Sequence, residues 1–198
     1  MKREKIFKKA CKGSSIQIIN NTYADKNGEI HTRNQWVNLG GAAYVIDFPR
    51  TLSENEILCL AGVPSEKVCE GFVRFTDSLE AGLDLYSSDS SDSDILLDRC
   101  NFVINGKFAL FRTASGAPTD TSIFLNEENL SLIDDEKDVE FFLREYGGES
   151  LCVIAKNGFM AIAVFLPFKF YRDEHSKLAD NAFTAYKIIQ GGITYEKT

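Results

Sequence analysis

Three Asn-Gly pairs, each lying between two β-rich runs, most strongly constrain how this 198-residue chain can fold. They are Asn27-Gly28, Asn105-Gly106 and Asn157-Gly158. Asparagine and glycine adopt positive φ at low cost, and the tight turns that join antiparallel strands require that conformation. Each pair therefore predicts a β-hairpin, the first with strands at about residues 15–23 and 29–38.

Further β-rich runs surround these hairpins, and helical signals are few. The segments "AAYVIDF", "GFVRF", "TSIFL" and "DVEFFLREY" predict additional strands. Helices are expected in the basic N-terminus, after the capping-box pair Ser53 and Glu56, from Ser65, and in the C-terminal run "RDEHSKLADNAFTAYKIIQGG". In "TSIFLNEENLSLI", a short helix is expected to follow the strand. Strands in runs, without regular βαβ alternation, predict an α+β fold with a mostly antiparallel sheet and two to four helices.

A serine- and aspartate-rich stretch divides these elements into two groups. Residues 76–98 contain seven acidic side chains and no basic one, and the stretch fits no EF-hand register because the required glycine and glutamate positions hold other residues. We therefore predict an exposed acidic linker at residues 85–94, between an N-terminal half (1–84) and a C-terminal half (95–198). Because each half is expected to hold several strands and a helix, two similar subdomains are an alternative.

The charge of the chain is unevenly distributed. Residues 1–12 carry six basic side chains and one acid within a net charge of −7, which leaves about −12 for the other residues. We expect a basic amphipathic first helix with Ile6, Phe7 and Ala10 docked on the core. Because an acidic body repels a nucleic-acid backbone, contact with nucleic acid is expected only through this basic N-terminal arm.

Apolar runs and cysteine usage indicate a cytoplasmic protein. No apolar run reaches the ~20 residues that span a bilayer, and the N-terminus lacks the apolar region of a secretory signal. We therefore expect no membrane partner. The cysteines are scattered singly, which predicts reduced thiols in the cytoplasm; they are Cys11, Cys59, Cys69, Cys100 and Cys152.

Motifs for metals, cofactors and hydrolases are absent or incomplete. The chain has no C-x-x-C pair, its two histidines lie far apart, and the run Asp173-Glu174-His175 is better explained as a helix N-terminus, so we expect no metal and no cofactor. The segment "GESLC" lacks the second glycine of a nucleophile elbow. A Cys/His or carboxylate site stays an alternative, because catalytic residues meet in space rather than in sequence.

The segment "ILCLAGVPSEKVCEGF" has the rhythm of a helix-turn-helix motif. Its second helix, however, would carry Glu66 and Glu70, whose charge opposes that of DNA. DNA binding by this route is therefore not expected. A clamp-like or other accessory role in DNA metabolism stays a further alternative, although the basic inner-face helices that it needs are not evident.

The segment "HTRNQWVNLGGAAY" is the most suggestive of binding. It holds the single tryptophan among amides, an arginine and a tyrosine, a composition that is typical of stacking and peptide-binding surfaces. We take Arg33, Trp36, Asn38 and Tyr44 as candidate binding residues. The alternative is that Trp36 is a core residue at the end of a strand.

The order W-V-x-x-G-x-A-A-Y, followed by a capped helix and by "NGKFALFRTASG" and "IAKNGFMAIAVFLPFK", resembles small uncharacterised proteins carried by phages and mobile elements of Firmicutes. The resemblance covers most of the chain and implies a role in element maintenance or host interaction. We therefore expect a non-enzymatic cytoplasmic binding or assembly protein whose partner is another protein or a second copy of the chain. A small hydrolase or transferase is the rival hypothesis.

Overall fold

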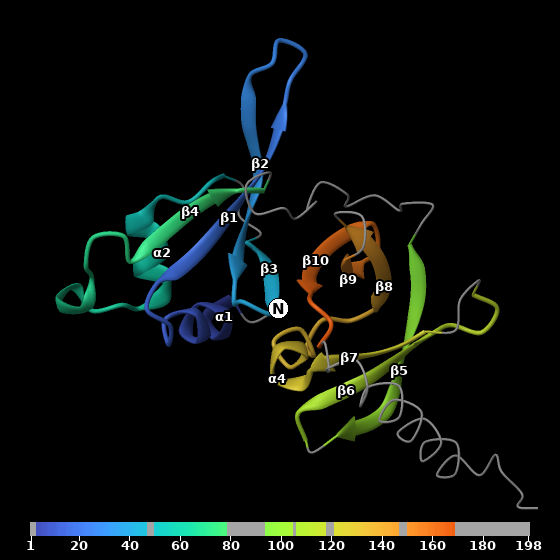
Figure 1. Ribbon diagram of the computed structural model, residues 1–198. Helices are drawn as coiled ribbons and strands as arrows, with labels where there is room; N and C mark the ends of the chain where they lie inside the picture. Colours follow the sequence, from blue (N-terminus) through green and yellow to red (C-terminus); the bar gives the residue numbers. More distant parts are fainter. Residues whose placement is uncertain are drawn as a thin grey trace, which may run out of the picture.

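The fold is α+β and is dominated by one sheet (Figure 1). The computed structural model describes residues 3–46, 50–78, 94–104, 106–117, 121–146 and 150–168. Within them, ten strands lie in the order β4-β1-β2-β3-β10-β9-β8-β5-β6-β7. Neighbouring strands are antiparallel, except that β1 and β4 are parallel.

The described part of the first half contributes four strands, in the order β4-β1-β2-β3, and two α-helices. Its elements are α1 (Arg3–Ala10), β1 (Ile16–Ala24), β2 (Ile30–Asn38), β3 (Ala42–Ile46), α2 (Glu54–Ala61), the 3₁₀ helix η1 (Ser65–Lys67) and β4 (Val73–Asp77). The capping box is confirmed, since the backbone N–H and the hydroxyl of Ser53 both donate to the Glu56 carboxylate. The predicted helix from Ser65 is only a single 3₁₀ turn, which is too short for the recognition helix of a helix-turn-helix motif.

The second half is a series of antiparallel strands interrupted by a single-turn helix. Its elements are β5 (Ile95–Ile104), β6 (Phe108–Thr113), β7 (Ser122–Asn126), α4 (Glu127–Leu130), β8 (Val139–Tyr146), β9 (Ser150–Asn157) and β10 (Met160–Phe165). Strand pairing confirms all three predicted hairpins, β1–β2, β5–β6 and β9–β10. The predicted C-terminal helix and the run Asp173-Glu174-His175 lie outside the described residues.

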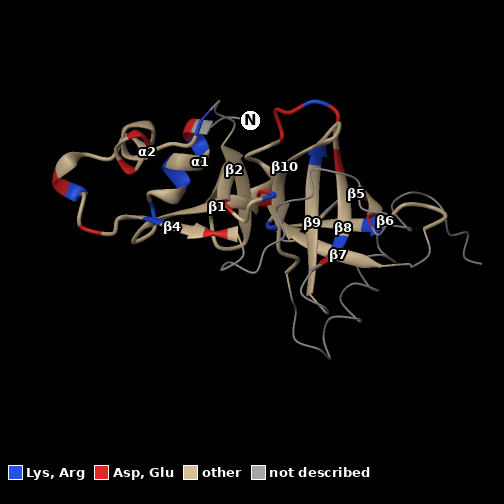
Figure 2. Cartoon of the chain, turned by 90° about the horizontal axis from the view of Figure 1, so that it is seen from above, with Lys and Arg blue, Asp and Glu red and all other residues tan. Residues whose placement is uncertain are grey.

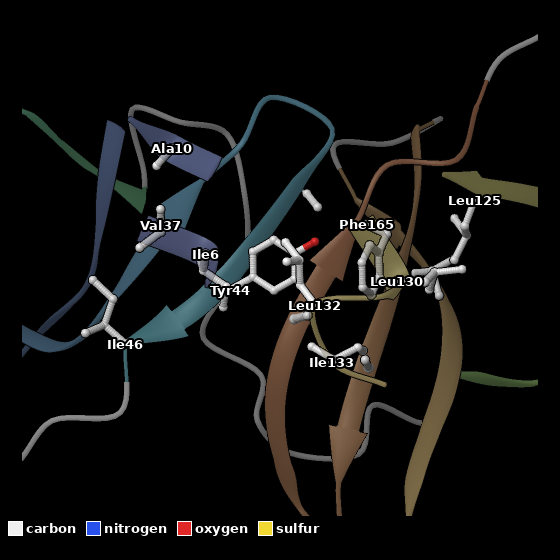
Figure 3. Packing of buried hydrophobic residues seen from close by; sticks show 14 of the residues in the cluster. Ile6, Ala10, Val37, Tyr44, Ile46, Leu125, Leu130, Leu132, Ile133 and Phe165 are labelled. Atoms are coloured by element: carbon white, nitrogen blue, oxygen red, sulfur yellow. The ribbon is translucent and has the colours of Figure 1, made fainter. Parts of the chain in front are cut away.

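The sheet is continuous across the two halves, and the structure gives no support to two similar subdomains. Tyr44 of β3 lies opposite Ala163 of β10, and the rings of Tyr44 and Phe165 meet edge to face at 5.9 Å. Figure 3 shows these side chains among core residues of both halves. The strand patterns also differ, because the parallel pair β1–β4 belongs to the first half alone.

The segment after β10 links the first half to the far edge of the sheet. The Leu166 N–H donates to the Gly41 carbonyl at 3.0 Å, and the Phe168 N–H donates to the Phe124 carbonyl of β7 at 2.9 Å. The ring of Phe168 also packs on Phe108 of β6 at 4.5 Å. The second half of the sheet therefore curls toward the loop between β2 and β3, and α4 lies where the two meet (Figure 1).

No described helix is both long and apolar enough to cross a membrane. The helix α1 is amphipathic as predicted, with Ile6, Phe7 and Ala10 buried. Figure 2 shows its basic residues in blue beside the acidic residues of α2 in red.

Candidate functional site

Two adjoining pockets lie where α1, the β2–β3 loop and α4 meet. The first has a volume of about 540 Å³ and is lined by Lys9, Leu39, Gly41, Asn126, Glu128, Asn129, Leu151, Leu166, Pro167 and Phe168. The second has a volume of about 410 Å³ and is lined by Lys9, Ala10, Lys12, Gly13, Ser14, Ser15, Gln17, Asn38, Leu39, Gly40 and Glu128. Because Lys9, Leu39 and Glu128 line both, we treat the two pockets as one site, the junction groove.

Lys9 lies at the centre of the junction groove and joins its two sides. Its Nζ donates to Asn129 Oδ1 at 2.8 Å and lies 3.1 Å from a carboxylate oxygen of Glu128. The Lys9 side chain is only 20% exposed, whereas Glu128 is well exposed. Since the apolar face of α1 is docked on the core, Lys9 at its flank reaches across to α4. This pair places a cation and an anion together on the shared wall of the groove.

Asn129 is held in the groove by its neighbours in α4 and β3. The Asn126 side chain caps α4 by accepting a hydrogen bond from the Glu128 N–H at 2.9 Å. The Asn129 carbonyl accepts a hydrogen bond from the Tyr44 hydroxyl at 2.9 Å. Burial, together with the nearby charge of Glu128, raises the pKa of Tyr44 well above its ordinary value, so the phenol stays a neutral donor.

Gly41 leaves the floor of the groove open. Its φ is not in the left-handed region, and a Cβ placed on it would meet only the Asn129 Nδ2 atom, at 3.5 Å. That distance is an ordinary van der Waals contact. A side chain at this position is therefore compatible with the backbone and would project into the groove, which makes Gly41 a suitable place to block it.

The four candidate binding residues do not share one surface. Trp36 and Tyr44 are 1% and 0% exposed, and they lie on opposite faces of the sheet. Trp36 packs with Ile19 and Val45, as the alternative of a core tryptophan described. Arg33 is exposed in the outer part of β2, 5.2 Å from the ring centre of Tyr23.

Two of those four residues nevertheless take part in the junction groove. Asn38 lines the second pocket, donates to Gln17 Oε1 at 3.1 Å and accepts from the Gly40 N–H at 2.8 Å. Tyr44 lies beneath the groove and supports α4 through the Asn129 carbonyl.

Sequence reasoning missed Lys9, Glu128 and Asn129. Lys9 is one of several basic residues of the predicted amphipathic helix, and the 119 and 120 positions that separate it from Glu128 and Asn129 hide the contact in the sequence. The only local signal was the helix start at Asn126, which is a favourable N-cap residue followed by two glutamates.

Cysteine and histidine side chains do not form a catalytic pair within the described residues. Burial raises the pKa of the Cys11 thiol. Burial also raises that of the Cys100 thiol, with a further increase from Asp98 and a partial offset from Arg112. Both thiols are therefore protonated at neutral pH and weakly nucleophilic. His31 lies in the β1–β2 hairpin, with its Nε2 3.5 Å from Asp25. His175 lies outside the described residues.

Asp25, Glu29 and His31 bring three metal-ligand atoms within 4.8 Å of one another. The expectation of no metal site rested on the missing C-x-x-C pair, the distance between the two histidines in the sequence and the helix start at residues 173–175, and it did not consider this hairpin. Glu29 and His31 are exposed, and Asp25 Oδ1 already accepts hydrogen bonds from the turn amides of Asn27 and Glu29 at 2.8 and 2.9 Å. This geometry is explained by the hairpin turn itself.

A second group of charges lies at the start of β5. The Asp94 carboxylate is 4% exposed and accepts hydrogen bonds from Arg144 Nε at 2.6 Å and from Lys156 Nζ at 2.7 Å. Lys156 Nζ also lies 4.7 Å from the ring centre of Phe142. Asp94 is the last residue of the predicted acidic linker, and this end is anchored in the fold. Residues 85–93 lie outside the described part of the chain.

The chain matches no protein-family model, no curated protein and no solved structure.

Proposed function

We propose that the chain is a non-enzymatic cytoplasmic protein that binds an extended segment of another protein in the junction groove. The observation that carries this proposal is the lining of the groove, which is mixed in its first pocket and mainly polar in its second. The first pocket presents the apolar side chains of Leu39, Leu151, Leu166 and Phe168 beside the polar ones of Lys9, Asn126, Glu128 and Asn129. The second presents Lys12, Ser14, Ser15 and Gln17. We call the apolar side chains of the first pocket the apolar end and the second pocket the polar end.

This lining fits a peptide better than a small metabolite. The apolar end accommodates one large aliphatic or aromatic side chain, whose burial supplies most of the affinity. The polar end offers an ammonium group, hydroxyls and an amide, which suit a carboxylate and the main-chain groups of a peptide. We expect the bound segment to carry an apolar anchor with an acidic residue a few positions away.

The resemblance to proteins of phages and mobile elements supports the same class of function. The resemblance implies a role in element maintenance or host interaction, and host interaction is a role that recognition of a protein partner would serve. The raised thiol pKa of Cys11 and Cys100 makes these two thiols poor nucleophiles at neutral pH.

Selection from a random peptide display library tests the proposal. The wild-type protein should enrich peptides with an apolar anchor and a nearby acid. Gly41→Leu, which fills the apolar pocket, should abolish enrichment, and Lys12→Glu should change the preferred charge from acidic to basic. Lys137→Glu, an exposed lysine that does not line the groove, is the matched control and should select the wild-type peptides.

The proposal is contradicted if the wild-type protein enriches no common pattern. It is equally contradicted if Gly41→Leu and Lys12→Glu enrich the same peptides as the wild type does, because the peptides would then bind elsewhere.

A further inference from the structure

The outer part of the β1–β2 hairpin stands clear of the sheet. On one side β4 pairs with β1 only as far as Asn20, and on the other β3 pairs with β2 only from Gln35 onward. Residues 21–34, which we call the arm, therefore pair as strands only with themselves within the described part of the chain. Figure 1 shows the arm projecting beyond the rest of the molecule.

The arm is held in shape by its own side chains. The turn is fixed by Asp25, whose carboxylate accepts from two turn amides, and by Gly28 at φ 81°. Along the strands, the rings of Tyr23 and His31 lie 5.5 Å apart, and Arg33 lies over the Tyr23 ring. A segment that is ordered before binding loses little conformational entropy when it binds.

No residue of the described segments pairs with the outer edge of β2 in the arm. The Asp25 N–H donates to the Glu29 carbonyl at 2.9 Å, so Asp25 and Glu29 form a hydrogen-bonded pair. Because such pairs alternate in an antiparallel ladder, the backbone groups of His31 point toward β1, and those of Ile30 and Thr32 point outward. The other edge differs, since the Thr22 N–H is bonded to the Ser78 hydroxyl. Ile30 is also 66% exposed, although it is a large apolar residue.

We propose that two copies of the chain associate through this edge, with their β2 strands antiparallel about a two-fold axis at His31. In this register the outward N–H and C=O groups of Ile30 form hydrogen bonds with those of Thr32 of the second copy. By symmetry, Thr32 of the first copy pairs with Ile30 of the second in the same way. The association is a strand addition, in which main-chain hydrogen bonds supply affinity and side-chain pairs select the partner.

Charge complementarity identifies the partner as a second copy. In a symmetric antiparallel pair of β2 strands, the two-fold axis passes beside one residue. Because only Ile30 and Thr32 have outward backbone groups to pair, the axis can lie at Ile30, His31 or Thr32. Centring on His31 places Glu29 opposite Arg33 of the second copy, twice in the symmetric pair. Centring on Ile30 places Glu29 opposite His31, and centring on Thr32 places Arg33 opposite His31. Only the His31 register pairs full opposite charges, and a two-fold interface must be complementary to itself.

The test is to reverse the charge of Glu29, of Arg33 and of both together, and to measure the affinity of the dimer. Sedimentation equilibrium of the full chain over about 10 μM to 1 mM suits an interface this small, which is expected to be weak. The wild-type protein should dimerise in a concentration-dependent way. Glu29→Arg and Arg33→Glu should each weaken the dimer by about 10-fold or more, because each places like charges opposite one another. The double variant Glu29→Arg/Arg33→Glu should restore it to within about 3-fold of the wild type.

Two further variants test whether dimerisation depends on the proposed strand pairing rather than on the general charge of the arm. Lys26→Glu changes a charge in the turn, outside the proposed pairs, and should dimerise as the wild type does. Thr32→Pro removes an outward N–H while sparing the bonds to β1, and should abolish the dimer. Circular dichroism of every variant should match the wild type, since these side chains lie outside the core clusters.

A monomer at all concentrations would overturn the proposal, as would a double variant that stays as weak as the single ones. The proposed function is tested separately, because peptide binding in the junction groove does not depend on arm residues.

Discussion

At the scale of single residues, Trp36 and Asp94 illustrate two different ways in which this sheet is stabilised. Trp36 is buried between Ile19 and Val45, and its Nε1 donates to Asn34 Oδ1 at 3.0 Å. Asp94 is buried between two cations instead. Truncating Trp36 leaves a cavity, whereas neutralising Asp94 removes the buried carboxylate that lies between Arg144 and Lys156.

Trp36→Ala is expected to lower the free energy of unfolding by about 3–5 kcal/mol, because truncation of a fully buried indole leaves a large cavity. Phe159 provides the matched control, since it is 86% exposed. Phe159→Ala should change the free energy of unfolding by no more than about 0.5 kcal/mol. Urea denaturation of both variants measures the difference. Equal small effects would mean that Trp36 lies at a surface.

Asp94→Asn should cost about 3–5 kcal/mol, as is usual when one partner of a buried ion pair is removed. Burial alone would raise the pKa of Asp94, but the hydrogen bonds and charges of Arg144 and Lys156 outweigh it, and the pKa is lowered. The stabilisation is therefore present above the ordinary carboxyl pKa and is lost as the pH falls through the lowered value.

Unfolding measured against pH tests this assignment. The difference between wild type and Asp94→Asn should shrink in that acidic range. Asp134→Asn is the control, because Asp134 forms an exposed ion pair with Arg99 at 3.2 Å, and it should cost less than about 1 kcal/mol. A constant difference at every pH would exclude the carboxylate as its source.

At the scale of the elements, local chemistry was sufficient to predict where the chain turns and where α2 begins. Asn-Gly pairs act through their own backbone conformation, and the Ser53–Glu56 box acts within one helical turn, so neither depends on distant residues. The pairing of β3 with β10 and the parallel pairing of β1 with β4 join segments far apart in the sequence, and no local signal predicts them.

The residues of the candidate site likewise depend on contacts between strands and helices that are distant in the sequence. The alternation of side chains along a strand separates Trp36 from Tyr44, because Trp36 lies opposite Val45 and Tyr44 is the next residue. The predicted strands did not exclude a surface containing both residues, because the register between the two strands comes only from the structure. The contact of Lys9 with Asn129 depends on how the curled second half meets α1, which only the tertiary structure determines.

The start of α2 should show an unusually acidic carboxyl group. Hydrogen bonds from Arg50 and then from Ser53 lower the pKa of Glu56 to about 2. NMR titration of the Ser53 amide should report this value, and Arg50→Ala should raise the midpoint toward that of an ordinary glutamate. Because the folded pKa is lowered, the cap persists from neutral pH down to that value and is lost below it. If Arg50→Ala leaves the titration midpoint unchanged, the ion pair with Arg50 does not lower the pKa of Glu56.

At the scale of the whole molecule, the continuous sheet makes the two halves interdependent. The main core contains buried residues from both, such as Ile57 and Val153, and β3 and β10 form a ladder between them. An unpaired β3 or β10 would expose a strand edge as well as apolar surface. One cooperative unit is expected rather than two.

Fragments 1–84 and 94–198, the second of which keeps Asp94, test this expectation. Neither should unfold cooperatively alone, and an equimolar mixture should recover the circular dichroism and the single transition of the intact chain. Cooperative unfolding of each isolated fragment would instead indicate two independent subdomains.

The junction groove is also a property of the whole molecule, because its walls come from α1, the β2–β3 loop and α4. Calorimetric titration of a selected peptide into the wild-type protein and into Gly41→Leu tests its role most directly. We predict that Gly41→Leu weakens binding by at least about 10-fold, since the new side chain occupies the space of the apolar anchor. The same affinity for both proteins, with Gly41→Leu unfolding at the wild-type temperature, would contradict binding in this groove.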